Sequence, residues 1–139
     1  MATPFAFEIV TPDKMLYSTE EATYVGFTAP SGGMGIEARH LPVTATLSVA
    51  PIKVNLVDGT VKYFAVCGGF LEMNGTKCTV LATIAEDGMT IDEARAEAAR
   101  KRAEERLASK AAEIDFDRAA AALQRALMRL KAHKLATGK

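Results

Sequence analysis

The stretch Thr90-Ile91-Asp92-Glu93-Ala94-Arg95-Ala96 is where the chain changes character. Before it, apolar residues alternate with polar ones, and glycine, asparagine and aspartate recur. After it, alanine, glutamate and arginine dominate, and neither glycine nor proline occurs before Gly138. Thr90 and Glu93 have the spacing of a capping box, in which the two side chains satisfy free N–H groups at the start of a helix. The stretch therefore predicts a helix that begins here and divides the chain in two.

Residues 1–88 consist of short runs of β-forming residues separated by turn-forming residues. The runs are Phe5–Val10, Met15–Tyr17, Ala22–Phe27, Leu47–Val49, Ile52–Leu56, Gly69–Met73 and Thr76–Leu81. Short strands at this spacing are typical of an antiparallel β-sandwich or flattened barrel, here of roughly eight to ten strands. About 85 residues are enough for one modest core.

Two dipeptides predict the turns of β-hairpins. Asp58-Gly59 is a two-residue hairpin signal, and pairing across it sets Leu56 against Val61 and Val54 against Tyr63. The agreement of this turn with the apolar pattern predicts the register of the two strands.

Asn74-Gly75 predicts a second hairpin of the same kind. In its register Cys78 faces Leu71 and Cys67 faces Ala82, so the two cysteines are not paired across the strands. We therefore expect free, buried thiols in a reducing compartment.

Residues 89–139 predict a helical hairpin. Only helix-favouring residues occur from Ile91 to about Ala111 and from Phe116 to about Leu135, with Asp115 as an N-cap between them. A connection of about four residues makes the helices antiparallel neighbours. The expected seam comprises Ile91, Ala94, Ala98, Leu107, Phe116, Ala119, Leu123, Leu127 and Leu130. Because alanine buries little apolar area, the hairpin should be held weakly and be mobile.

The fold class predicted is thus α+β. A β-sandwich domain at 1–88 precedes a helical hairpin at 89–139. The first part carries nine acidic and five basic residues, and the second carries eight acidic and twelve basic ones, so the net charges are −4 and +4. The halves can attract each other, or the basic half can serve an acidic partner. Zero net charge overall and the lack of an aromatic stacking platform argue against nucleic-acid binding. No signal peptide and no membrane-spanning run is evident, so we expect a soluble intracellular protein without direct membrane insertion.

Residues for catalysis or metal binding do not form a recognisable group. His40 and His133, the two histidines, fall in different parts of the chain, and the two cysteines lack metal-ligand spacing. Gly32-Gly33-Met34-Gly35 matches neither phosphate-loop pattern. We therefore expect no enzymatic activity, no catalytic residue and no metal site.

Arginines are repeated at the same spacing on both predicted helices. Arg95, Arg102 and Arg106 lie seven and four residues apart, as do Arg118, Arg125 and Arg129. In an antiparallel hairpin, Arg95 approaches Arg125 and Arg129. Such a group of guanidinium forks suits a phosphate ligand. The alternative is a solvated charged face with weak surface ion pairs.

With these features together, the chain resembles the ε subunit of bacterial F-type ATP synthases. The most specific segments are Gly33-Met34-Gly35-Ile36 followed by His40-Leu41-Pro42, the strand start Gly68-Gly69-Phe70-Leu71-Glu72, and Ile91-Asp92-Glu93-Ala94-Arg95-Ala96. The last segment is similar to the I/L-D-x-x-R-A pattern of ε subunits that bind ATP. The chain departs from the family at Gly33, where glutamate is usual, and at Glu37-Ala38-Arg39, where a proline is usual.

The resemblance implies a non-catalytic rotor subunit that couples proton flow to ATP synthesis. In such subunits the sandwich contacts the γ subunit and the ring of c subunits. The hairpin either folds on the sandwich or extends into the α/β catalytic head and blocks ATP hydrolysis. The implied location is the cytoplasmic face of the bacterial cell membrane, as a peripheral protein.

The resemblance also implies two sets of functional residues. ATP, with or without magnesium, is a regulatory ligand that favours the folded hairpin, and its implied contacts are Glu86, Ile91, Asp92, Arg95, Ala96, Arg102, Arg125 and Arg129. The implied contacts with γ and the c ring are Gly33, Met34, Gly35, Ile36, His40 and Pro42. The alternative is a purely structural rotor adaptor whose hairpin binds no nucleotide.

Overall fold

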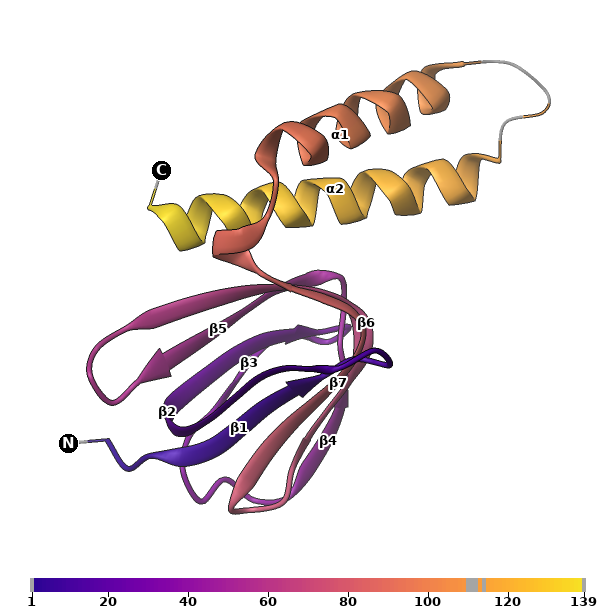
Figure 1. Ribbon diagram of the computed structural model, residues 1–139. Helices are drawn as coiled ribbons and strands as arrows, with labels where there is room; N and C mark the ends of the chain where they lie inside the picture. The colour runs from indigo at the N-terminus through magenta and orange to yellow at the C-terminus, as the bar shows by residue number, and fades with distance from the viewer. Residues whose placement is uncertain (1, 110–112, 114, 139) are drawn as a thin grey trace.

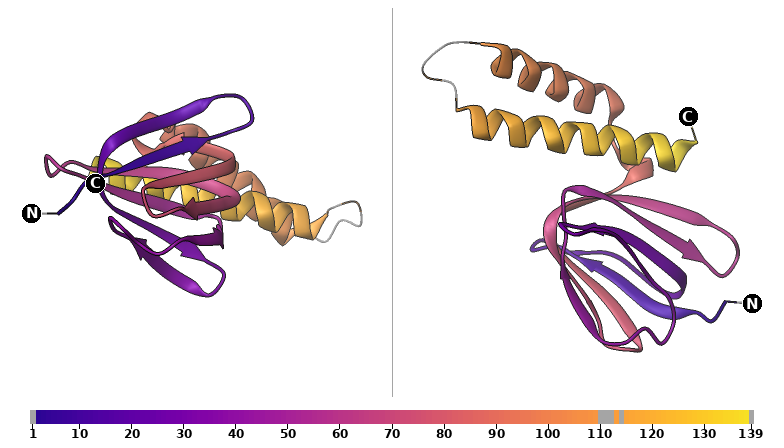
Figure 2. Two further views of the ribbon diagram at one scale, coloured as in Figure 1. Left: turned by 90° about the horizontal axis from the view of Figure 1, so that it is seen from below. Right: turned by 180° about the vertical axis from the view of Figure 1, so that it is seen from behind.

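The computed structural model describes residues 2–109, 113 and 115–138, and it places a β-sandwich beneath two antiparallel helices (Figure 1). The strands are β1 (Phe5–Val10), β2 (Met15–Ala29), β3 (Gly32–Ile36), β4 (Val43–Thr46), β5 (Ala50–Leu56), β6 (Val61–Met73) and β7 (Lys77–Asp87). A 3₁₀ turn (Gly88–Thr90) leads to α1 (Glu93–Ala108) and α2 (Phe116–Thr137). The helices lie across one end of the sandwich and project beyond it (Figure 2). The predicted α+β architecture is confirmed.

The strands form one sheet that closes on itself. Their order is β1-β7-β6-β5-β2-β3, with β1 also paired to β2 and β4 paired to β6. Within the described residues there are seven strands rather than the eight to ten expected. The reason is that β2 and β6 span 15 and 13 residues, and each takes part in two layers. Along β2, for example, the first half pairs with β1 and the second half with β3 and β5.

Gly69 forms the corner at which β6 passes between layers. Residues before it pair with β5, and residues after it pair with β4. Gly69 has a φ of 124°, and a Cβ at this position would lie 2.1 Å from the carbonyl oxygen of Leu81. Only glycine fits both the backbone conformation and the space.

The sandwich core follows the alternation of side chains along the strands. Its largest fully buried side chains are Phe7, Phe64, Ile9, Ile36, Ile52, Leu71, Met73, Val25, Val54, Val66, Val80 and Cys78. No charged residue is buried in the described part of the chain. The sandwich therefore holds itself together by apolar packing around a closed sheet.

The register predicted for the β5–β6 hairpin is wrong by one residue. Asn55, not Leu56, faces Val61, and Val54 faces Lys62. The Asp58 carboxylate accepts a hydrogen bond from the Thr60 N–H at 2.9 Å, and the Leu56 N–H donates to the Thr60 carbonyl at 2.9 Å. The loop thus has three residues instead of two. A shift of one residue in the register places each side chain of one strand opposite the other set of side chains on its partner strand.

The β6–β7 hairpin turns one residue later than predicted. Cys78 faces Met73 rather than Leu71, and Cys67 faces Ile84 rather than Ala82. The Asn74 side chain accepts hydrogen bonds from the N–H groups of Thr76 and Lys77, and the Asn74 N–H donates to the Lys77 carbonyl at 3.2 Å, so the turn is centred on Gly75 and Thr76. This shift of two residues keeps each side chain on its predicted face. Both cysteines are buried and free, as predicted.

The helix start differs from the predicted capping box. Asp92 is the N-cap of α1, and its carboxylate accepts a hydrogen bond from the Arg95 N–H at 3.0 Å. Thr90 instead donates its hydroxyl to the carbonyl of Asp87 at 2.9 Å within the 3₁₀ turn. Aspartate is at least as good an N-cap as threonine, so α1 begins two residues later. The predicted cap at Asp115 is confirmed.

The helical seam is made of smaller side chains than predicted. Ala96 and Ala103 of α1 and Ala119 and Ala126 of α2 are buried. Of the predicted seam, Ile91 and Ala119 are buried, whereas Ala94, Ala98, Phe116 and Leu127 are exposed. Alanines let two helices approach more closely than leucines do. α1 ends at Ala108, not Ala111, and part of the connection lies outside the described residues.

We predict that Leu71→Ala destabilises the sandwich by about 2–5 kcal/mol, because Leu71 is fully buried. Phe70→Ala is the matched control, since Phe70 is 55% exposed and surface substitutions usually stay within about 0.5 kcal/mol. Urea unfolding followed by circular dichroism measures both. Equal losses of stability would contradict the alternation of β6.

Candidate functional site

A cleft of about 540 Å³ lies where the hairpin meets the sandwich. Its walls come from the end of β7, the segment before α1, the first turns of α1, and α2. The lining residues are Glu86, Thr90, Ile91, Asp92, Arg95, Ala96, Ala99, Arg102 and Arg129. Parts of the chain more than 40 residues apart therefore meet here, as the Glu86–Arg129 contact illustrates.

The first turns of α1 form one wall because of helical spacing. Arg95, Ala99 and Arg102 are separated by four and three residues, so they share a face of the helix. Ile91 and Ala96 are buried and pack in the cluster that joins the hairpin to the sandwich. The wall thus combines an apolar floor with two long cationic side chains.

Arg129 of α2 joins the opposite wall to the sandwich. Its Nε donates to the Glu86 carboxylate at 2.6 Å, and both side chains are partly exposed. This ion pair links α2 directly to the end of β7. Because it joins the middle of α2 to the sheet, it helps to determine where the helix lies.

The cleft has an excess of positive charge. Arg95, Arg102 and Arg129 face two acids, Glu86 and Asp92. Glu86 is paired with Arg129, and the Asp92 carboxylate accepts a hydrogen bond from the backbone N–H of Arg95. Within the described residues, no salt bridge engages Arg95 or Arg102. Two guanidinium groups are therefore available to an anionic ligand.

Arg125 lies outside the group. It does not line the cleft, although its side chain is half-buried on α2. Its charge acts instead on Cys67 of β6. Burial raises the pKa of the Cys67 thiol, while Arg129 and Arg125 oppose that rise. Arg95 and Arg129 thus line one cleft, but the structure does not bring Arg125 to it.

The structure thus assembles seven of the eight positions expected for a nucleotide contact, all but Arg125. Thr90 and Ala99 also line the cleft and were not among the expected residues. Ala99 follows from helical spacing once Arg95 and Arg102 are placed on one face. No sequence pattern predicts Thr90 as a lining residue. In the structure its hydroxyl donates a hydrogen bond to the Asp87 carbonyl.

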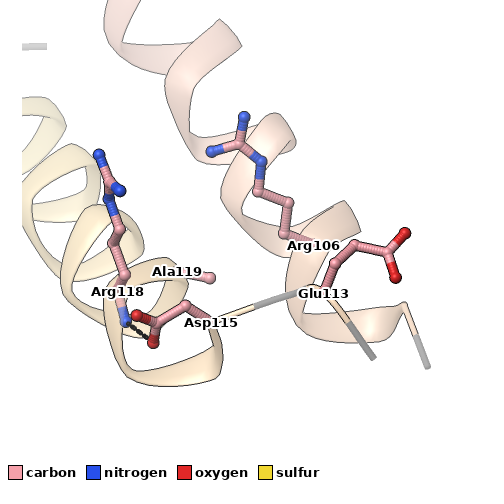
Figure 3. Close-up of a pocket in the computed structure, with 5 residues that line it drawn as sticks. All are labelled: Arg106, Glu113, Asp115, Arg118 and Ala119. Atoms are coloured by element: carbon pink, nitrogen blue, oxygen red, sulfur yellow. Dashed lines mark hydrogen bonds between the residues drawn. The ribbon is translucent and has the colours of Figure 1, made fainter. Parts of the chain in front are cut away.

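The remaining arginines of the repeated pattern lie at the far end of the hairpin (Figure 3). Arg106 and Arg118 line a separate hollow of about 330 Å³ together with Glu113, Asp115 and Ala119. In Figure 3 the two arginine side chains extend side by side, and Asp115 accepts the backbone N–H of Arg118. The six arginines are therefore divided between the cleft, the outer hollow and the surface over Cys67.

The residues expected to meet γ and the c ring lie on β3 and in the loop that follows. Gly33 and Gly35 are exposed, but Ile36 is fully buried, so the side chain of Ile36 is not available to a partner. His40 and Pro42 lie in the loop before β4, beside Leu41, which is 79% exposed. Because Val43 pairs with Met73, this loop lies near the β6–β7 turn, at the opposite end from the hairpin (Figure 1).

Two further features of the described residues concern clusters of metal ligands and membrane-spanning helices. No three histidine, cysteine, aspartate or glutamate side chains gather in a way that could hold a metal ion in the part of the chain the structure covers. Neither α1 nor α2, as described, is long and apolar enough to cross a membrane.

Comparison with known proteins places both parts of the chain in one family. Residues 4–88 match the family model for the ATP synthase delta/epsilon chain β-sandwich domain, and residues 90–134 match the model for its long α-helix domain. An ATP synthase epsilon chain from Bacillus cytotoxicus is 45% identical over 91% of this chain and 93% of its own length. One from Desulforamulus reducens is 42% identical over 95% of this chain and 98% of its own length.

Solved structures share the fold. A chain of the Euglena gracilis mitochondrial ATP synthase has a TM-score of 0.80 at 18% identity, covering 95% of this chain and 82% of that chain. A chain of the Tetrahymena thermophila mitochondrial ATP synthase central stalk and c ring has a TM-score of 0.60 at 14% identity, with coverages of 95% and 98%.

We predict that Arg129→Ala speeds modification of Cys67 by a thiol reagent about two- to fivefold, because a partly exposed ion pair stabilises by up to about 1 kcal/mol. Cys67 packs under α2 beside Met128 and Ala132, so its reactivity reports release of the helix. Arg125→Ala is the matched control, since Arg125 also opposes the rise in the pKa of Cys67 but has no salt bridge in the described part of the chain. Mass spectrometry distinguishes Cys67 from Cys78. Equal rates in both variants would contradict a docking role for Arg129.

Proposed function

From the premise that the chain belongs to the delta/epsilon-chain family of ATP synthase, we propose that its hairpin is a regulatory element held on the sandwich by ATP. Its relatives over nearly the full length are ATP synthase epsilon chains. The proposed role of the protein is that of a non-catalytic rotor subunit. The observation that carries the regulatory part is the cleft whose walls belong to both the sandwich and the hairpin.

The chemistry of the cleft suits a nucleotide. Guanidinium groups match phosphate oxygens in geometry and charge, and Arg95 and Arg102 are available for them. Arg129 donates its Nε to Glu86, and its terminal nitrogens have no partner in the described part of the chain. Ile91, Ala96 and Ala99 offer an apolar surface for a flat ring. The volume of about 540 Å³ is within the range of small-molecule sites.

A ligand in this cleft would bind only the folded hairpin, because lifting α2 separates Arg129 from Glu86. Binding that favours one state stabilises it by about 2.7 kcal/mol at 100 times Kd. The docking surface consists mainly of small side chains, namely Ala65, Cys67, Ala96 and Ala132, with Ile91 and Met128. Such a surface contributes little apolar burial, so a ligand of ordinary affinity decides the population. Any magnesium would be carried by the nucleotide phosphates.

The proposed partners are the γ subunit, the c ring and, for the extended hairpin, the α/β head. An exposed apolar row supports a protein contact on the sandwich: Phe70 is 55% exposed and Leu81 51%, and they face each other on β6 and β7. Val10 lies beside Leu81 on β1. We assign this row to γ, and the loop carrying His40, Leu41 and Pro42 to the c ring. The hairpin's net charge of +4 suits an acidic surface in the head. These contacts would hold the protein peripherally at the cytoplasmic face of the membrane.

One observation favours a second candidate, a structural adaptor that binds no nucleotide. Glu86 already accepts a hydrogen bond from the Nε of Arg129, and Arg125 does not line the cleft. In that case the cleft arginines are a solvated face. The two candidates differ in what ATP does to the isolated chain.

We predict that ATP binds the isolated chain and that Arg95→Ala or Arg102→Ala weakens binding about tenfold or more. Hydrogen bonds to charged groups are each worth about 1.5–3 kcal/mol, which corresponds to this loss. Lys101→Ala is the matched control, because Lys101 neighbours Arg102 in sequence and does not line the cleft. Arg125→Ala should have a smaller effect than Arg129→Ala. Isothermal calorimetry measures the wild type and the five variants, and unchanged affinity in the cleft variants would favour the adaptor.

We also predict that saturating ATP slows modification of Cys67 about tenfold or more, by holding α2 down. Cys78 provides an internal control. It lies in the sandwich core, where burial raises its pKa to about 12, so ATP should not change its reactivity. An adaptor would show the same Cys67 rate with and without ATP. Release of inorganic phosphate by the pure chain would contradict the non-catalytic assignment.

A further inference from the structure

His133 joins three elements at the C-terminal end of the hairpin. It lies on α2, and its Nδ1 is 2.9 Å from the carbonyl oxygen of Gly88 in the 3₁₀ turn. Its Nε2 is 3.8 Å from a carboxylate oxygen of Glu93, the first residue of α1. The imidazole is 14% exposed, whereas the Glu93 side chain is 65% exposed. The ring therefore links α2 to the hinge between the sandwich and the hairpin.

The hinge and α2 are in direct contact at this point. A Cβ at Gly88 would lie 2.7 Å from the carbonyl oxygen of Tyr63, 2.9 Å from that of Ala132 and 2.9 Å from the Cβ of Ala136. No side chain fits there without moving α2 or β6. This close packing sets the position from which His133 reaches both of its neighbours, and any lifting of α2 must break both contacts.

Both neighbours of the ring are hydrogen-bond acceptors. A neutral imidazole carries one N–H, so when Nδ1 donates to the Gly88 carbonyl, Nε2 presents a lone pair toward the Glu93 carboxylate 3.8 Å away. The imidazolium carries two N–H groups and a positive charge. It can donate to Gly88 and attract the Glu93 carboxylate at the same time. A proton on His133 therefore strengthens the attachment of α2 to the hinge.

The other charged groups around the ring are already engaged or exposed. On the hinge, Asp87 accepts from Lys62 and from the Met89 N–H. Asp92 caps α1, and Arg129, one turn before His133, is paired with Glu86. Lys134, next to His133 on α2, is exposed, so water screens its repulsion. From β6, Tyr63 presents its backbone carbonyl to Gly88. Glu93 is thus the carboxylate that responds to the charge of His133.

We infer that His133 is a pH-sensitive latch that holds the helical hairpin on the sandwich when protonated. Histidine side chains change charge between about pH 5 and 8, so the added stabilisation of the docked hairpin is present at the acidic end of that range and is lost as the pH rises. Protonation of His133 acts separately from nucleotide binding. The inference rests on the part of the proposed function in which the hairpin leaves the sandwich.

The test measures Cys67 modification by a thiol reagent in the full chain without nucleotide, at pH 5.5 and pH 8. The rate of each variant is divided by that of the wild type at the same pH, which cancels the intrinsic pH dependence of the thiol. Glu93→Gln removes the charge and keeps the size of an exposed side chain. Glu105→Gln is its matched control on the same helix, since Glu105 is exposed and has no salt bridge in the described part of the chain. His133→Gln retains a donor for Gly88 without titrating, and Gly88→Ala serves as the released form.

We expect the Glu93→Gln ratio to be close to one at pH 8 and to rise about threefold at pH 5.5, as for a partly exposed ion pair. His133→Gln should behave in the same way, and Glu105→Gln should stay at one throughout. Ratios for Glu93→Gln and His133→Gln that do not change with pH would overturn the latch alone. A Cys67 that stays unreactive even in Gly88→Ala would overturn hairpin release, and the latch with it.

Discussion

The packing of α2 on the hinge at Gly88 is the contact on which the arrangement of the hairpin depends. The backbone of Ala132 and the side chain of Ala136 approach Gly88 so closely that a methyl group would not fit. Any larger residue would push α2 away from β6. Met128 and Ala132 would then separate from Ala65 and Cys67, and Arg129 would move away from Glu86. The cleft exists because a glycine at the end of the sandwich lets a helix touch the hinge.

The two parts of the chain are stabilised in different ways. The sandwich combines a closed sheet with a continuous core of large apolar side chains. The hairpin rests on it through small side chains, one partly exposed ion pair and one histidine. Apolar burial is non-directional, so the polar contacts add direction to the position that the packing at Gly88 allows. They are also the contacts that a ligand or a proton can change, which makes the docked state conditional while the sandwich remains folded.

The sequence places residues of the cleft together wherever the geometry is local. Ile91, Asp92, Arg95, Ala96 and Arg102 lie within about three helical turns, and the helix repeat alone places them together. Arg125 does not line the cleft, and the reason is not local. It shares a helix face with Arg129, but how far each reaches along the cleft depends on where α2 lies across β6, and no local pattern contains that information. The same limit explains the seam, where buried alanines replaced the leucines that apolarity alone favoured.

The amino-acid sequence by itself determined the division of the chain at residues 88–92, the alternation of the strands and the helical phase of the Arg95 face. Each of these follows from backbone stereochemistry over a few residues. The tertiary structure decided the registers of the two hairpins, the choice of Asp92 over Thr90 as the cap, and the meeting of Glu86 with Arg129 across 43 residues of sequence. In each of these cases the local sequence allows alternatives of nearly equal free energy. Long-range packing and hydrogen bonds select among the alternatives, and these contacts exist only once the chain has folded.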